Sequence, residues 1–183
     1  AKPGDVLILT KPIGSGVLFN ANLKNWVSKE AMKECVDIIT TLNRSAAEVL
    51  ANFDVHAVTD VTGFGLAGHS FEMARGSRIS FVINIDEVPI MNEALEMYKK
   101  GMNTGTNRFN RQLVQDHLRF EKELPTWHQE IFFDPQTSGG LLIAVSEEYG
   151  LQVLEALRQA KVKHARIIGK VNALENSTHL IFR

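Results

Sequence analysis

A carboxylate followed directly by a glycine-rich turn stands in the segment Thr59–His69. The residue types predict the end of a strand, then Asp60, then a turn that enters a helix. A helix N-terminus offers unpaired N–H groups and the positive end of a dipole, so this turn can hold a phosphate. A carboxylate repels a phosphate unless a cation lies between them, and Mg²⁺ is usually held by one or two carboxylates together with phosphate oxygens and water. The segment therefore predicts a metal–phosphate site, with Asp60 on the metal and Thr62, Gly63 and Gly65 on the phosphate side.

Two other interpretations of this segment stay open from the residues alone. In the first, Asp60 and Thr62 cap the helix, and the glycines only allow close packing. In the second, Gly63–Gly68 matches the G-x-G-x-x-G pattern of a dinucleotide-binding turn, and Asp86 follows at about the expected 20 residues, at the end of the next predicted strand. The polar residues before the turn, and a carboxylate with no metal to neutralise it, argue against the second interpretation.

The loop Asp134–Gly140 contains an acid, two hydroxyls and two glycines, and it precedes the apolar run Leu141–Val145. Such a loop can bind an anion or orient a metal-bound water. Its candidate residues on the phosphate side are Thr137, Ser138 and Gly139. The competing interpretation is a tight turn whose polar side chains bond to the local backbone, and the pattern alone favours that turn.

Other residues with reactive or metal-binding side chains are interpreted as structural. Cys35 falls on the apolar stripe of a predicted helix, where a free cysteine behaves as a small hydrophobe. His69 follows the glycine-rich turn and could reach Asp60, although a packing or capping role is favoured. Asn107 and Arg108 lie in a polar stretch that we expect to be a solvated loop. The six histidines form no i, i+4 pair and no cluster with the cysteine, so no zinc site is expected.

Strands and helices that would position these residues alternate along most of the chain. Apolar or alternating runs predict strands over Val6–Thr10, His56–Val61, Ile79–Ile85, Leu141–Val145, Ala165–Val171 and Thr178–Phe182. Apolar residues at three- and four-residue spacing, together with helix start and stop signals, predict helices over Ser28–Ala51, Gly63–Arg75, Pro89–Lys100 and Glu147–Ala160. The stretch Gln112–Trp127 has an ambiguous pattern and is expected to be helical before Pro125. The polar stretch Asn103–Arg111 is expected to be a loop, and Asn172–Ser177 is expected to join the last two strands as a hairpin.

This alternation predicts a single α/β domain over residues 1–183, with a mixed sheet because the last two strands would be antiparallel. The chain has 183 residues and a formal net charge of -1, so it lacks the basic excess typical of a nucleic-acid partner. No apolar run approaches the roughly 20 residues that span a bilayer. The single cysteine fits a reducing compartment. We therefore expect a cytoplasmic protein without a membrane or nucleic-acid partner.

Segments along the whole chain, in the same order and at similar spacing, resemble the C-terminal domain of the selenophosphate synthetase family. They are Lys2–Asp5 with Thr10–Gly16, Thr59–His69, Asp134–Leu142 and Ile168–Val171. Single motifs of this kind recur in the wider aminoimidazole ribonucleotide synthetase superfamily, whereas the run Asp-Pro-Gln-Thr-Ser-Gly-Gly points to the selenium branch. The resemblance implies a layered α/β domain, with a mixed β-sheet packed against helices.

The resemblance also implies an activity, that of a selenide, water dikinase, which converts ATP, selenide and water to selenophosphate, AMP and orthophosphate. ATP would bind largely to an N-terminal domain that is absent here, with several Mg²⁺ ions on aspartates, and one of those aspartates corresponds to Asp60. The family's reactive cysteine or selenocysteine and its essential lysine lie in a segment without a counterpart in this sequence. We therefore expect no catalytic residue in this chain and no activity from it alone. The implied partners are the N-terminal domain and a second copy in a homodimer. A non-catalytic interaction domain of the superfamily remains the alternative.

Overall fold

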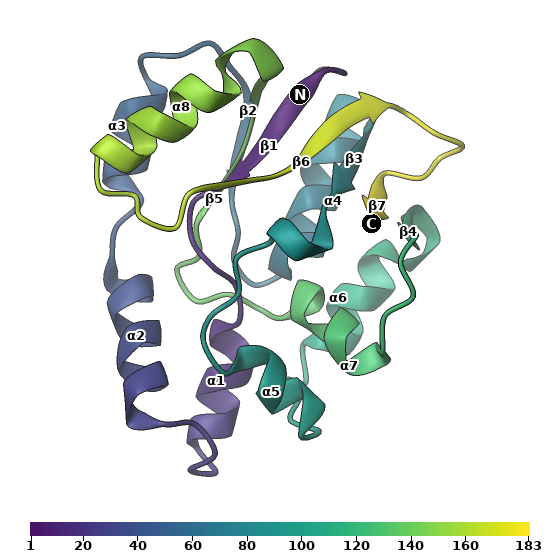
Figure 1. Cartoon of the computed structure of the whole chain (residues 1–183). Coiled ribbons are helices and arrows are strands. Elements are labelled where there is room, and N and C mark those ends of the chain that lie inside the picture. The colour runs from purple at the N-terminus through teal and green to yellow at the C-terminus, as the bar shows by residue number, and fades with distance from the viewer.

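The computed structural model describes residues 1–183 and shows an α/β domain built on a seven-stranded mixed sheet (Figure 1). The strand order across the sheet is β2-β5-β1-β6-β3-β7-β4. Neighbouring strands are antiparallel except where β7 pairs with β3 and β4, which it meets in parallel. The strands are β1 (Asp5–Leu9), β2 (Val55–Asp60), β3 (Ile79–Ile83), β4 (Leu118–Phe120), β5 (Leu141–Ser146), β6 (Arg166–Ala173) and β7 (Leu180–Phe182).

Helices cover both faces of the sheet, with α3 and α8 on one face and α4 on the other (Figure 1). The helices are α1 (Ser15–Asn22), α2 (Lys29–Thr40), α3 (Arg44–Leu50), α4 (Gly65–Ser77), α5 (Ala94–Lys99), α6 (Asn107–Val114), α7 (Thr126–Gln129) and α8 (Glu147–Gln159). Short 3₁₀ turns lie at η1 (Ile85–Glu87), η2 (Gln115–His117) and η3 (Glu130–Phe133). No helix combines the length and the apolar composition needed to cross a membrane. The predicted fold class is confirmed.

The central strands feed two hydrophobic cores because successive side chains of a strand point to opposite faces. In β1, Leu7 and Leu9 belong to the larger core with α4, whereas Ile8 belongs to the smaller core with α3 and α8. In β5, Leu142 and Ile143 divide in the same way. These side chains are all fully buried, which agrees with the continuous apolar runs in both strands.

The predicted hairpin of the last two strands is wrong, because β3 lies between β6 and β7. Phe81 of β3 is opposite Val171 of β6 on one side and Leu180 of β7 on the other. Buried Ser80 fixes the segment that crosses the end of β3: its hydroxyl donates to Thr178 O (2.6 Å) and accepts from Glu175 N (3.0 Å). The sheet is therefore mixed because β7 is parallel to β3 and β4.

The predicted helix Ser28–Ala51 is interrupted between α2 and α3. The Thr41 hydroxyl donates to Asp37 O (2.8 Å), and its own carbonyl accepts from Lys11 Nζ (2.6 Å). Asn43 Nδ2 donates to Gly139 O (2.9 Å). Hydrogen bonds to residues distant in the sequence thus fix this break. The three- and four-residue spacing of apolar side chains does not predict it.

The segment between β3 and β5 also differs from the prediction. The polar stretch expected to be a loop contains most of α6, because Asn107 and Asn110 are buried and bonded rather than solvated. The stretch predicted as the helix Gln112–Trp127 contains β4. The predicted helix Pro89–Lys100 begins only at Ala94, since Ile13 forms a β-bridge with Ile90 and holds that part extended.

Candidate functional site

The start of α1 is capped by a carboxylate that lies 118 residues later in the sequence than Gly16. Gly14, at the N-cap position, has no side chain to offer. The carboxylate of buried Asp134 instead accepts from Gly16 N (3.0 Å) and Val17 N (2.8 Å). Tyr98 Oη donates to the same carboxylate (2.6 Å). The otherwise unpaired N–H groups of the first helical turn are satisfied in this way.

Gln136 completes this contact two residues after Asp134. Its Oε1 accepts from Gly14 N (2.9 Å), Ser15 N (3.2 Å) and the Ser15 hydroxyl (3.1 Å). Its Nε2 donates to Asp134 Oδ2 (2.9 Å), and Thr137 N donates to Ser15 Oγ (2.9 Å). We refer to Gly14–Val17, Tyr98, Asp134 and Gln136 as the buried cluster. The polar side chains of the loop therefore bond to α1 more than 100 residues away, and not only to the local backbone.

Glycine is required where the same loop passes β2 and β1. A Cβ on Gly139 would collide with Val61 O, and one on Gly140 would collide with Lys11 N. Lys11 Nζ donates to Ser138 O (2.8 Å) as well as to Thr41 O, and burial lowers the pKa of this amine. Gly139, predicted on the phosphate side, is thus buried and has a packing reason to be glycine.

The end of β2 and the tip of the loop form an exposed surface beside the buried cluster. Gln136 N donates to Thr62 O (2.9 Å), which brings Thr137 and Ser138 alongside the turn after β2. Asp60 is exposed, and its carboxylate forms no hydrogen bond or ion pair with the chain. Val61 is fully buried, as expected where alternate side chains of an extended segment point inward, so Asp60 and Thr62 share the outward face. We refer to Asp60, Thr62, Gly63, Thr137 and Ser138 as the exposed site.

The two glycines predicted in the turn differ in their surroundings. Gly63 is exposed, with open space where a Cβ would lie. Gly65 has a positive φ of 70° and is buried, and a Cβ there would lie 2.9 Å from Asp134 O. Leu66 and Ala67, which follow it, are fully buried. The first turn of α4 is therefore enclosed by protein, and only the residues before it are open.

The structure agrees neither with capping by Asp60 and Thr62 nor with a dinucleotide-binding turn, although Gly65 does allow the close packing that the first alternative expected. The N-cap residue of α4 is Phe64, and no side chain caps this helix, so Asp60 and Thr62 do not serve as caps. A dinucleotide-binding unit requires adjacent parallel strands around its helix, whereas three strands separate β2 from β3. Asp86 lies in η1 and pairs with Lys122 (2.8 Å).

His69 contacts the exposed site directly, which the sequence did not favour. Its Nε2 lies 3.1 Å from Thr62 Oγ1, and its Nδ1 lies 3.2 Å from Glu72 Oε2. Glu72 was not identified from the sequence, although its i, i+3 spacing from His69 places both on one side of a helix. Asn107 is buried and bonds to Glu130, while Arg108 is exposed.

Cys35 is buried in the larger core, as predicted. Burial raises the pKa of its thiol to about 11. A protonated thiol is a poor nucleophile and a poor metal ligand, so the structure gives this residue a packing role.

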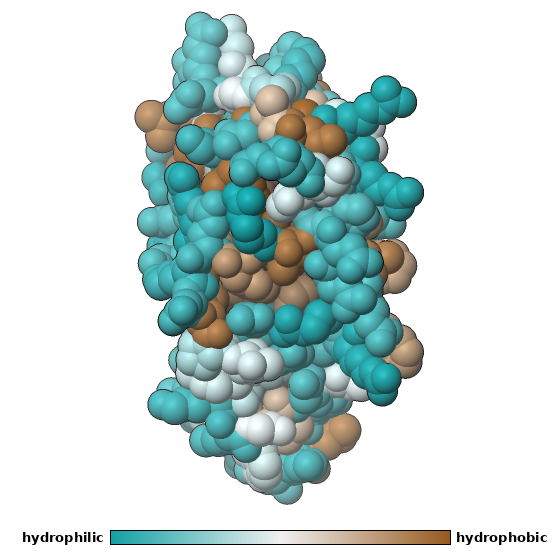
Figure 2. Space-filling model, turned by 90° about the vertical axis from the view of Figure 1, so that its right-hand side faces the viewer, coloured by the Kyte–Doolittle hydropathy of each residue, from teal (hydrophilic) through white to brown (hydrophobic).

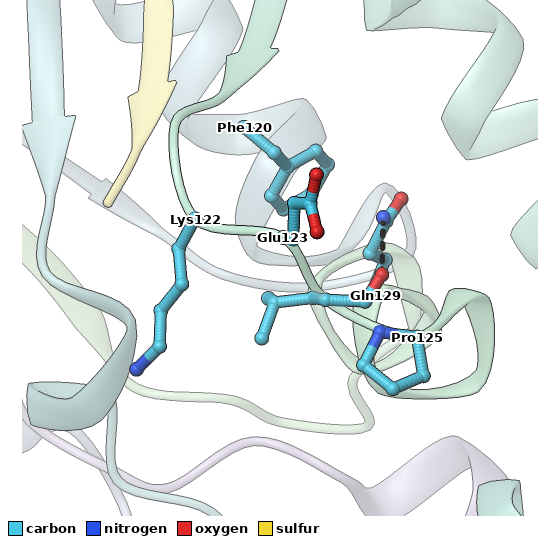
Figure 3. Close-up of a pocket in the computed structure, with 6 residues that line it drawn as sticks. Phe120, Lys122, Glu123, Pro125 and Gln129 are labelled. Carbon is cyan, nitrogen blue, oxygen red and sulfur yellow. Dashed lines mark hydrogen bonds between the residues drawn. The ribbon is translucent and has the colours of Figure 1, made fainter.

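The exposed site lies outside both of the main cavities. One cavity of about 610 Å³ opens on the side that carries β4, where apolar side chains lie among hydrophilic ones (Figure 2). It is lined by residues that include Phe120, Lys122, Pro125 and Gln129 (Figure 3). The other, of similar volume, lies between α2 and the loop after α8 and includes Lys11. Asp60 lines neither of these two cavities.

The oxygen ligands of the exposed site suit a cation that also takes ligands from outside the chain better than a cation enclosed by this chain alone. No group of three or more His, Cys, Asp or Glu side chains in the chain is placed to hold a metal ion. Asp60 nevertheless presents an unpartnered carboxylate, and Mg²⁺ commonly takes one or two carboxylates and completes its shell with phosphate oxygens and water. The site therefore suits a Mg²⁺ ion whose other ligands come from outside the chain.

The sequence matches the family model described as "AIR synthase related protein, C-terminal domain" over residues 2–181. It is 42% identical over 160 residues to the "Selenide, water dikinase" of Treponema denticola, covering 87% of this chain and 45% of that protein. It is 38% identical over 181 residues to "Selenide, water dikinase 2" of Peptoclostridium acidaminophilum, covering 99% of this chain and 52% of the relative. The chain thus spans about half the length of these curated relatives.

Solved structures share the fold at lower sequence identity. A hydrogenase maturation protein HypE matches with a TM-score of 0.65 and 19% identity, over 96% of this chain and 46% of HypE. The thiamine-monophosphate kinase of Stenotrophomonas maltophilia matches with a TM-score of 0.66 and 14% identity, over 100% of this chain and 51% of the kinase. At such identities the likeness concerns the fold alone.

Proposed function

Because this chain belongs to the family of AIR synthase related C-terminal domains, we propose that it is the C-terminal domain of a selenophosphate synthetase. The whole enzyme would convert ATP, selenide and water to selenophosphate, AMP and orthophosphate. The observation that carries the proposal is the identity of about 40% with selenide, water dikinases over nearly the whole chain. The exposed site supports it, because an open carboxylate together with the exposed hydroxyls of Thr137 and Ser138 suits a metal and a phosphate.

Asp60 is the residue that we assign to the metal. Its carboxylate is exposed and has no partner within the chain, so binding a cation would break no existing contact. Ionised oxygen is the ligand type that Mg²⁺ prefers. Bound there, the ion would offset the charge on the phosphate oxygens of ATP during transfer. Asp60 stands at the end of β2, whose pairing with β5 fixes its backbone.

Thr137 and Ser138 are the residues that we assign to the phosphate side, together with the backbone of Gly63. All three are exposed, and the hydroxyls can donate to phosphate oxygens. Gly65 and Gly139 contribute by allowing the two loops to approach each other closely. The remaining ligands, the nucleophile and the catalytic lysine would come from an N-terminal domain, within a protein that we expect to be a homodimer.

The experiment joins this chain to the N-terminal half of the Treponema denticola relative and measures AMP formation with and without selenide. We expect selenide-dependent AMP from the joined protein and none from the 183-residue chain alone. For the Asp60→Asn variant of the joined protein, the matched control is Asp116→Asn, since Asp116 is also exposed and forms no ion pair. A joined protein that binds ATP but forms no selenide-dependent AMP would contradict the proposal, as would activity of the chain alone.

A further inference from the structure

Thr62, His69 and Glu72 form a row of hydroxyl, imidazole and carboxylate that begins two residues after Asp60. Thr62 Oγ1 lies 3.1 Å from one ring nitrogen of His69, and Glu72 Oε2 lies 3.2 Å from the other. The imidazole side chain is only 10% exposed, whereas that of Glu72 is 54% exposed. The Phe64 ring packs against the imidazole, with the ring centroids 5.4 Å apart. The ring is therefore held with one nitrogen toward each partner.

This arrangement decides where the proton of the Thr62 hydroxyl lies. An ionised carboxylate can only accept, so of the two tautomers of the neutral ring Glu72 selects the one that carries its proton on Nδ1. Nε2 then carries a lone pair, and Thr62 Oγ1 must donate to it. The Thr62 hydroxyl makes no other hydrogen bond, so its oxygen keeps its lone pairs free.

The contact is not needed to close α4. The N-cap position of that helix is Phe64, and the Thr62 hydroxyl bonds to no backbone N–H of the helix. The backbone of Thr62 is already held through its carbonyl, which accepts from Gly65 N (3.0 Å) and Gln136 N (2.9 Å). Other hydrogen bonds thus fix the backbone of Thr62, and the imidazole fixes the orientation of its side chain.

We propose that His69 is a positioning residue that turns the Thr62 hydroxyl into an oxygen ligand on the cation side of the site. A hydroxyl whose proton is engaged can coordinate a cation or accept from a metal-bound water, but it cannot donate to a phosphate oxygen. Thr62 shares the outward face with Asp60 and is placed to act beside it. The inference rests on the proposed function and moves Thr62 from the phosphate side, where the sequence placed it, to the Mg²⁺ side.

The first test uses the 183-residue chain itself and nitrogen NMR of its histidine rings. We expect His69 Nδ1 to give the signal of a protonated nitrogen and Nε2 that of an unprotonated one. Thr62→Val should shift the Nε2 signal, Thr62→Ser should shift it less, and exposed His164 should not respond. A proton on Nε2 of His69 would overturn the inference, because Thr62 would then accept.

The second test uses the joined protein and the Mg²⁺ concentration that gives half-maximal turnover. Thr62→Val should raise this concentration on the order of 10-fold, the scale for changes around a metal site, while Thr62→Ser stays near wild type. His69→Ala should raise it less and add nothing in the Thr62→Val background. The inference would be overturned if His69→Ala had the same effect in the wild-type and Thr62→Val backgrounds. It would also be overturned if Thr62→Val changed only the KM for ATP. If the joined protein is inactive, the proposed function fails while the NMR result still decides the inference.

Discussion

Asp134 of the buried cluster and Asp60 of the exposed site belong to two loops with similar composition and have opposite surroundings. Each loop combines an aspartate, hydroxyls and glycines. Asp134 is fully buried and accepts from four donors, whereas Asp60 is exposed and accepts from none. A carboxylate whose hydrogen bonds are all made within the chain holds the fold, and one left open is available to a ligand. Residue type alone does not distinguish the two roles, whereas burial and partners do.

The largest effect on stability is expected for Asp134→Ala in the buried cluster. The change removes the side-chain acceptor of Gly16 N and Val17 N and the nearer acceptor of Tyr98 Oη, which keeps only Asn107 Oδ1 at 3.3 Å, and each such loss costs about 1–3 kcal/mol. We expect the free energy of unfolding to fall by about 3–5 kcal/mol in denaturant titrations. Asp116→Ala, at an exposed position, should change it by less than about 0.5 kcal/mol. Similar small effects for both variants would remove the distinction between the two regions.

The free energy of unfolding should depend on pH through Asp134 of the buried cluster. Burial raises the pKa of Asp134 from 3.8 to about 7, although hydrogen bonds from Tyr98, Gln136, Gly16 and Val17 act in the opposite direction. The carboxyl of Asp134 therefore releases its proton at a lower pH in the unfolded chain than in the folded chain. Its contribution to the free energy of unfolding is complete below about pH 4 and is lost as the pH rises through 7. The free energy of unfolding should decrease from pH 5 to 7, by at most about 1.4 kcal/mol per pH unit from this group. Asp134→Asn should show a flatter profile, and an unchanged slope in that variant would contradict the assignment.

A smaller effect is expected for Cys35→Ala, which trims a buried side chain and leaves both regions in place. We expect a loss of at most about 1–2 kcal/mol in the free energy of unfolding. Turnover of the joined protein should stay at the wild-type value, because a thiol with a pKa near 11 is protonated at neutral pH. A large fall in turnover with the fold intact would show that this core residue takes part in the reaction.

The smallest effect on stability is expected for Asp60→Asn in the exposed site. The carboxylate has no partner to lose, so the midpoint of thermal unfolding should stay at the wild-type value within error. Asn keeps the size of the side chain and much of its hydrogen bonding. A clear loss of stability would mean that Asp60 holds the fold, as Asp134 does.

The α/β class, most strands, α4 and α8 could be predicted from the sequence because their apolar residues follow the period of the element. The hairpin prediction failed because Ser80, about 95 residues earlier, fixes the crossing segment. The helix break at Thr41 depends on Lys11, and α6 depends on buried asparagines that the sequence presents as polar. These features arise from contacts between distant residues, which local spacing does not encode.

The candidate site could be located from the sequence, but its internal roles could not all be assigned. The motif around Asp60 marked the end of a strand and an open turn, which the structure shows. Gly65 and Gly139 turn out to be buried, and that depends on which backbone segments approach them. The contact between Thr62 and His69 depends on a ring orientation that Phe64 and Glu72 set together. Side-chain orientation of this kind follows from packing and not from the order of residues.

The turnover of Asp60→Asn across a Mg²⁺ titration tests the central claim most directly. The measurement compares the joined protein with and without the change, and Asp116→Asn serves as the matched control. Loss of one oriented electrostatic contact typically lowers the rate on the order of 10²–10³-fold, and we expect a fall of that size with thermal stability unchanged. Wild-type turnover of Asp60→Asn at every Mg²⁺ concentration would contradict the assignment of Asp60 to the metal.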